Sequence, residues 1–140
     1  MKRILSTLTA LCCTFISLTA SATGPDTLRV LSIANSLGVD QVENNLHEIG
    51  KADGLVLVIG SLYYPACDLK THHANALCDS AAYSYRKINA AGQRVKRSGS
   101  TMEYALLDEP WDVVSIMQAG NMAGQIETYE PYLTEIIRYV

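Results

Sequence analysis

The stretch RVLSIANSLGVD, residues 29–40, decides the fold because a strand pattern and a helix pattern meet inside it. The aliphatic run LRVLSI (28–33) has the length and composition of one buried strand. Beyond it, apolar residues recur at steps of three and four, which predicts a helix with one apolar face. These residues are Val39, Val42, Leu46 and Ile49. Ser36 lies at the junction, either as a nucleophile on a strand-to-helix turn or as a residue that only satisfies turn and helix-end groups.

The rest of the chain continues the alternation of strands and helices. LVLVIGSLY (55–63) and WDVVSIMQ (111–118) are apolar almost without interruption, as expected of strands covered on both faces. Between and after them we expect a loop with a short helix, a surface hairpin and a last helix, at 68–77, 83–97 and 129–140. This order predicts an α/β fold in which helices cover a parallel sheet.

Residues 1–22 have the layout of a secretory signal peptide. A basic start, MKR, precedes an apolar segment, and the small residues ASA end at Ala22. A membrane anchor is the alternative, but the apolar segment from Ile4 to Ala20 is short and rich in Ser and Thr. We therefore expect a secreted or periplasmic protein that has no membrane attachment after cleavage and whose mature part, 23–140, is one domain.

Composition and side-chain spacing exclude several kinds of site. The net charge is −3, and no basic face predicts a nucleic-acid partner. His72 and His73 are adjacent and point in different directions on a helix or strand, so they make a poor metal pair. We expect no metal and no cofactor. Export permits a disulfide between Cys67 and Cys78, but a free cysteine packed as a small apolar side chain is the alternative that we favour.

Four segments carry a resemblance to a known family. SIANSLG (32–38), GSLYYPACDL (60–69), AYSYRKI (82–88) and EPWDVVSIMQ (109–118) occur in this order. Together they resemble a bacterial branch of the SGNH (GDSL-type) hydrolases that is known only as a domain of unknown function. The resemblance implies a three-layer α/β/α sandwich with a parallel sheet, and an enzyme that cleaves esters, often acyl groups on sugars or lipids.

The resemblance also implies roles for individual residues. Ser36 takes the position of the nucleophile, and the backbone N–H of Ala66 and the side-chain amide of Gln118 take those of oxyanion donors. Together with the backbone N–H of Ser36, these make three donors at the ends of three strands, which could converge where negative charge develops. Asn35, His72 and Asn121 are candidate substrate contacts, for a small-molecule or carbohydrate ester. His47 is expected to be a solvated residue in the middle of the first helix.

The base that should activate Ser36 is absent from these 140 residues. In the SGNH family a D-x-x-H segment supplies it, and no such segment occurs here. We therefore expect the chain to be the N-terminal part of the domain, with weak activity or none. Ala34 and the pair Pro65–Ala66 stand where the branch has glycines, which is a second reason to expect an altered site. The alternative is a non-catalytic descendant that binds a glycan or a protein partner.

Overall fold

The computed structural model of the chain describes residues 27–140. The expected signal peptide, residues 1–22, lies outside the described residues and stays a prediction. Within the described part, no helix has the length and apolar character needed to cross a membrane.

The described residues form a mixed α/β fold around one five-stranded sheet, with strand order β4-β3-β2-β1-β5. The strands are β1 (Thr27–Ala34), β2 (Val56–Tyr63), β3 (Tyr83–Ile88), β4 (Arg94–Ser100) and β5 (Val113–Ile116). β1 pairs in parallel with both β2 and β5. The prediction of a fully parallel sheet is wrong, because β3 and β4 join it in antiparallel orientation. Only five residues separate β3 from β4, and so short a connection reverses the chain.

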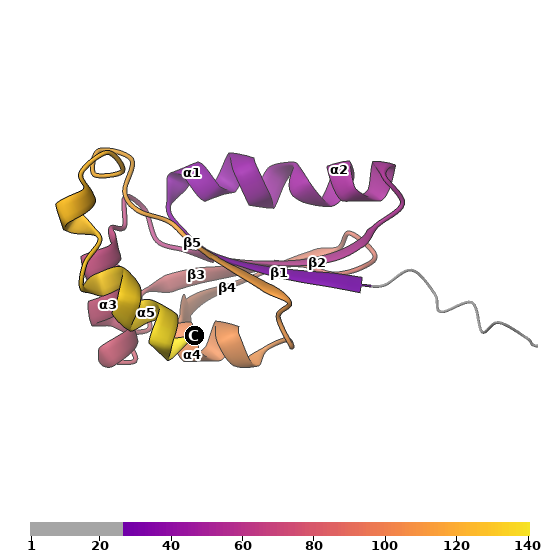
Figure 1. The fold of residues 1–140 in the computed structure, drawn as a ribbon. Helices are drawn as coiled ribbons and strands as arrows, with labels where there is room; N and C mark the ends of the chain where they lie inside the picture. Colours follow the sequence, from indigo (N-terminus) through magenta and orange to yellow (C-terminus); the bar gives the residue numbers. More distant parts are fainter. Residues whose placement is uncertain (1–26) are drawn as a thin grey trace, which may run out of the picture.

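Helical segments lie on both sides of this sheet (Figure 1). Above it in the figure are α1 (Ser36–Gly38), the π-helix η1 (Val39–Asn44) and α2 (Leu46–Ala52). Below it are α3 (Leu69–Leu77), α4 (Met102–Leu107) and α5 (Tyr132–Tyr139). A short 3₁₀ turn, η2 (Ile126–Thr128), lies between β5 and α5 in the chain.

The first helical region begins earlier and is less regular than predicted. Asp40 and Glu43 have the spacing of a capping box, which is typical of a helix start, whereas in the structure the side chain of Asn35 caps α1 by accepting a hydrogen bond from the N–H of Leu37. Asp40 instead accepts hydrogen bonds within η1 and just after it, through its carboxylate from Asn44 and through its backbone carbonyl from Asn45. The wider π turn therefore lies where the first regular helical turns were expected.

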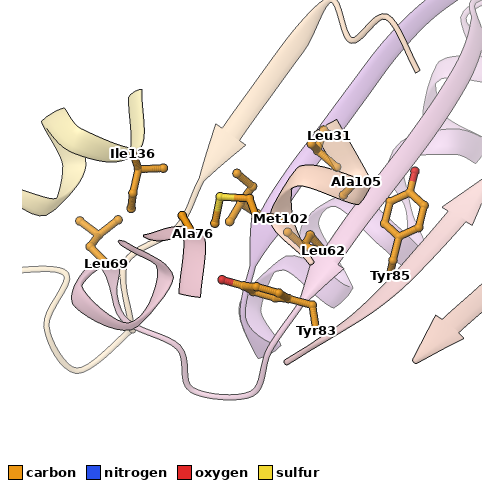
Figure 2. Packing of buried hydrophobic residues seen from close by; sticks show 10 residues of the cluster. Leu31, Leu62, Leu69, Ala76, Tyr83, Tyr85, Met102, Ala105 and Ile136 are labelled. Carbon is orange, nitrogen blue, oxygen red and sulfur yellow. The ribbon is translucent and has the colours of Figure 1, made fainter. Parts of the chain in front are cut away.

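Two clusters of buried apolar residues lie on opposite faces of the sheet. The larger one lies between the sheet and the helices α3, α4 and α5, and Figure 2 shows part of it. Its fully buried members include Leu31, Leu62, Tyr83 and Met102. The smaller cluster consists of Leu57, Ile59 and Ile88 and packs against η1 and α2. Most of the buried apolar area, and with it most of the hydrophobic stabilisation, is therefore on the α3–α5 side.

Contact with the hairpin buries His47, which we expected to be solvated. Its side chain is 7% exposed, and its Nδ1 lies 3.1 Å from the Glu48 carboxylate. The turn between β3 and β4 covers it, since a Cβ atom added at Gly92 would lie 3.2 Å from the His47 ring. Helix periodicity could not reveal this burial, because the covering residues come from a hairpin more than forty positions away.

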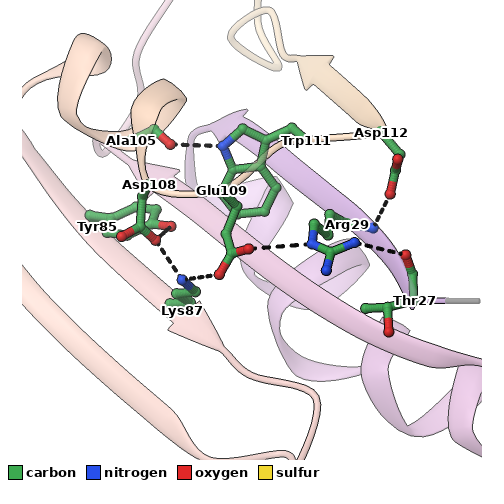
Figure 3. A network of polar contacts seen from close by, with 9 residues as sticks. All are labelled: Thr27, Arg29, Tyr85, Lys87, Ala105, Asp108, Glu109, Trp111 and Asp112. Carbon is green, nitrogen blue, oxygen red and sulfur yellow. Dashed lines mark hydrogen bonds and ion pairs between the residues drawn. The ribbon is translucent and has the colours of Figure 1, made fainter.

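A network of charged residues fixes the start of β5 (Figure 3). Lys87 of β3 forms ion pairs with Asp108 and Glu109, which lie between α4 and β5. Glu109 also pairs with the Arg29 guanidinium at 3.3 Å, and the backbone N–H of Arg29 donates to the Asp112 carboxylate at 2.8 Å. These contacts hold the segment before β5 against β1 and β3.

Candidate functional site

The candidate site lies at the rim where the three parallel strands end. β1, β2 and β5 end at Ala34, Tyr63 and Ile116, and parallel strands present their carboxyl ends at the same edge of a sheet. Ser36 is the first residue of α1, directly after β1, and its side chain is exposed. In the part of the chain that the structure describes, its hydroxyl has no hydrogen-bond partner. The position of Ser36 is therefore open to a ligand at this rim.

Asn35 connects the three strand ends beneath Ser36. It is 2% exposed, and its Nδ2 donates to the backbone carbonyls of Cys67 at 3.1 Å and Gln118 at 3.0 Å. Its Oδ1 accepts from the N–H of Leu37 at 3.1 Å. All these bonds are within the chain, and a contact of Asn35 with substrate stays a prediction. In the structure Asn35 brings together the segments that follow β1, β2 and β5.

Hydrogen bonds at both the oxygen and the nitrogen of its side-chain amide hold Gln118 in place. Its Oε1 accepts from the backbone N–H groups of Leu69 at 3.0 Å and Ala119 at 2.9 Å. Its Nε2 donates to the hydroxyl of Thr128 at 3.0 Å and to the carbonyl of the same residue at 3.3 Å. An oxyanion contact by Gln118 therefore requires its amide to leave Thr128. Sequence reasoning missed Thr128, since its loop carries no motif.

Ala66 lies in the segment after β2 in a conformation that favours glycine. Its φ is +52°, in the left-handed region, where a side chain costs roughly 1 kcal/mol. The residue is exposed, and its N–H has no acceptor among residues 27–140. The N–H of Ser36 likewise has no acceptor in that range. Two backbone donors are therefore unpaired. One is the N–H of Ser36 itself, and the other is the N–H of Ala66, the residue before the Cys67 whose carbonyl accepts from Asn35.

His72, a candidate substrate contact, is enclosed by the fold and is not exposed at the rim. It is fully buried, its ring stacks on Tyr83, and its Nδ1 lies 3.0 Å from the Tyr83 hydroxyl. Burial disfavours the charged imidazolium and lowers the pKa of His72 to about 4. The helix periodicity of 68–77 does not show that this face packs on β3.

The other candidate residues are not brought into a catalytic cluster. Asn121 is exposed in the loop after β5, where its backbone carbonyl accepts from Gln125. His73 packs beside the Tyr132 ring. Residues 27–140 contain no group of three side chains able to hold a metal ion, and no histidine in that range hydrogen-bonds to Ser36.

The structure decides between the two alternatives for the cysteines. Cys67 and Cys78 are both unpaired, with Cys67 buried and Cys78 exposed. Burial raises the pKa of the Cys67 thiol to about 12, which keeps it protonated and a poor nucleophile at neutral pH. Cys67 therefore contributes its backbone carbonyl to the site, and its side chain packs as a small apolar group.

Comparison with known proteins identifies the family. The sequence profile of a domain of unknown function, DUF4886, matches residues 29–140. The chain belongs to the DUF4886 family. Among curated proteins none matches it.

One solved structure of a DUF4886 protein is similar to this chain. It is a crystal structure at 1.50 Å resolution of a family member from Bacteroides uniformis, with 38% sequence identity and a TM-score of 0.79. The match covers 81% of this chain and 44% of that protein. The match thus covers less than half the length of the relative, and the fold of the matched part is similar to that of a second DUF4886 protein.

Proposed function

We propose that this chain carries the nucleophile of an exported, SGNH-type ester hydrolase. The observation that carries the proposal is the pair of hydrogen bonds from Asn35 to Cys67 and Gln118, directly beneath an exposed Ser36. A buried amide that ties three strand ends together gives a serine at this rim a fixed position. Preorganised geometry of this kind is what nucleophilic catalysis requires.

The reaction we propose is ester hydrolysis through an acyl-enzyme. The Ser36 hydroxyl attacks the ester carbonyl carbon, its proton goes to a base, and the carbonyl oxygen becomes an oxyanion. The N–H groups of Ser36 and Ala66 are its proposed donors. Collapse breaks the bond to the alcohol, and water then releases the acid from Ser36. The base comes from polypeptide outside the 140 residues, and acylated carbohydrate is the substrate class that the family resemblance suggests.

The proposal is tested with and without the rest of the domain. Because residues 27–140 give Ser36 no base, we expect no hydrolysis of p-nitrophenyl acetate by the chain alone above the rate of its Ser36→Ala variant. A chimera that continues the chain with the remaining part of the Bacteroides uniformis protein should hydrolyse the ester. There, Ser36→Ala should lower the rate by at least ~10³-fold.

The exposed Ser98 on β4 offers a matched control. Ser98→Ala should leave the activity of the chimera unchanged, because this serine lies on the edge strand farthest from β5. A folded chimera whose activity is the same with and without Ser36 would contradict the proposal.

A second candidate function, glycan binding without catalysis, is favoured by the two features that weaken an oxyanion site. The Gln118 amide is already bonded to Thr128, and Pro65 before Ala66 has no N–H to donate. In that case binding on a glycan array should survive Ser36→Ala. No detectable glycan would count against it.

A further inference from the structure

The edge of the sheet at β5 differs from an ordinary solvent-facing edge. β5 pairs only with β1, so its outer side has no partner strand within residues 27–140. β1 and β2 run parallel to it, and parallel strands are normally covered on both faces. Yet Val113, at the start of β5, is 46% exposed.

A hollow lies on each side of β5. On the α4–α5 side a cavity of about 570 Å³ is lined by Trp111, Val114, Leu106, Leu107 and Tyr139, together with the acidic residues Glu103 and Glu109. On the α2 side a cavity of about 390 Å³ is lined by Val113 together with Leu28, Leu46, Ile49 and Leu55. Several of these side chains are largely exposed, with Leu107 at 78% and Ile49 at 64%. Apolar residues exposed along both faces of one strand indicate a surface that another chain segment covers.

The surface is already formed and needs no rearrangement. The backbone N–H of Arg29 donates to the Asp112 carboxylate, and the indole N–H of Trp111 donates to the carbonyl of Ala105 at 2.8 Å (Figure 3). These bonds fix the residues immediately before β5 against β1 and α4. A segment that docks here therefore meets a rigid edge.

Handedness indicates on which side a further strand would lie. β1 connects to β2 through α1, η1 and α2 on one face of the sheet, whereas α5 lies on the other face (Figure 1). Parallel crossover connections are right-handed, so a connection over the opposite face moves in the opposite direction across the sheet. A parallel strand reached over α5 would therefore lie beyond β5, at the open edge.

We propose that the β5 edge and its two hollows dock a β-strand and flanking apolar helices from the part of a DUF4886 domain that lies outside the residues matched to this chain. The relative from Bacteroides uniformis has more than half of its length outside the match, so the family has such polypeptide to supply. The incoming strand pairs in parallel with Val113–Ile116, and apolar side chains on its two faces fill the cavities. This inference rests on family membership and on the edge, and it holds whether or not Ser36 is a nucleophile.

The test is complementation in trans. The 140-residue chain is co-expressed with the separately tagged remaining part of the Bacteroides uniformis protein. We expect a 1:1 complex in which hydrogen exchange at Val113–Ile116 slows at least tenfold, while exchange in β4 is unchanged. Absence of a complex, or protection that spares β5, would overturn the proposal. So would a β5-protected dimer of the chain alone, because a second copy would then be the occupant.

Two exposed valines on opposite edges give a matched pair of variants. Val113→Lys on β5 should weaken the complex at least tenfold, while Val95→Lys on β4, where the valine is 64% exposed, should leave it unchanged. Ile49→Lys, in the hollow beside β5, is a second variant that does not alter the strand itself. Equal effects of the two valine variants would contradict the docking surface. The complex should also form with Ser36→Ala, so a complex without hydrolysis would refute only the proposed function.

Discussion

The two faces of the sheet are packed in different ways. The face beneath α3, α4 and α5 carries the large apolar cluster, in which side chains such as Leu62 are completely buried. The face beneath η1 and α2 has three fully packed apolar residues, Leu57, Ile59 and Ile88, with Val42 and Leu46 only partly buried against them. The helix that begins at Ser36 therefore lies on the more weakly packed face.

Buried polar groups differ between the faces in the same sense. Ser115, Ser32, Ser61 and Arg86 occupy one register row across β5, β1, β2 and β3, on the side where Arg86 pairs with Glu43 of η1. The three hydroxyls and the Arg86 Nε are buried and have no hydrogen-bond partner within residues 27–140. On the other face the buried Tyr83 hydroxyl contacts both His72 and Asn75.

The two faces of the sheet therefore contribute differently to the stability of the fold. The α3–α5 face supplies stability mainly through apolar burial, although the buried Nε2 of His72 on this face also has no hydrogen-bond partner within residues 27–140. The η1 face accommodates small polar residues and a π-helix, at a cost in unpaired hydrogen-bonding groups. Substitutions matched across the two faces can test this difference.

The largest expected difference is between two leucines. Leu62→Ala on the α3–α5 face removes a completely buried side chain and should lower the free energy of unfolding by about 2–5 kcal/mol. Leu46→Ala, on the η1–α2 face, removes a partly exposed one and should lower it by less than half as much. Urea denaturation of both variants measures the difference. Equal losses would show that the two faces are packed alike.

The pH dependence of stability should come largely from the α3–α5 face. The pKa of His72 is lowered from 6.5 to about 4, so the unfolded chain binds the proton more tightly. Stability is therefore complete above about pH 6.5 and falls as the pH decreases toward 4, by about 3 kcal/mol in total. Denaturant titrations at several pH values should show this slope in the wild type.

Variants at two neighbouring histidines identify the group responsible. His72→Gln should remove most of the slope, whereas His73→Gln, beside the Tyr132 ring, should keep it. A slope that persists in His72→Gln would assign the pH dependence to other groups.

The smallest expected effects come from removing one buried hydroxyl on each face. Tyr83→Phe leaves His72 and Asn75 without their partner and should destabilise the fold by about 1–2 kcal/mol. Ser61→Ala removes an unpaired hydroxyl and should be neutral or stabilising by up to about 1 kcal/mol. Thermal unfolding of the two variants distinguishes the expected loss of stability in Tyr83→Phe from the expected gain, or absence of change, in Ser61→Ala. A loss of stability in Ser61→Ala would mean that its hydroxyl has a partner, such as an ordered water.

Local patterns were sufficient for the central strands. The predicted strands 28–33 and 55–63 correspond to β1 and β2, because short aliphatic runs rich in β-branched residues are typical of a strand buried on both faces. The hairpin at 83–97 was predicted as surface structure, but its first strand joins the sheet and buries Tyr83 and Tyr85. Alternation along a strand shows that one face is apolar, but it does not name the strand that pairs with it.

The candidate site was predictable to a lesser degree. The chain position of Ser36, after a strand and before a helix, already placed it at the rim. The roles of Asn35 and Gln118 were not predictable, because each depends on partners that are distant in the sequence. Asn35 bonds to the carbonyl of Cys67, and Gln118 bonds to the N–H of Leu69 and the hydroxyl of Thr128. His47 and His72 were misjudged for the same reason, since distant segments cover both.

The amino-acid sequence by itself determined the order of strands and helices, the place of Ser36 in that order, and membership in a family. Hydrophobic periodicity and turn residues depend on a few neighbouring positions, so they can be recognised in the sequence alone. Only the tertiary structure decided which side chains are buried, which amides are already bonded, and that β5 is an edge strand of the sheet within residues 27–140, with a hollow on each side. Burial and hydrogen bonding there depend on residues that meet only after the chain has folded.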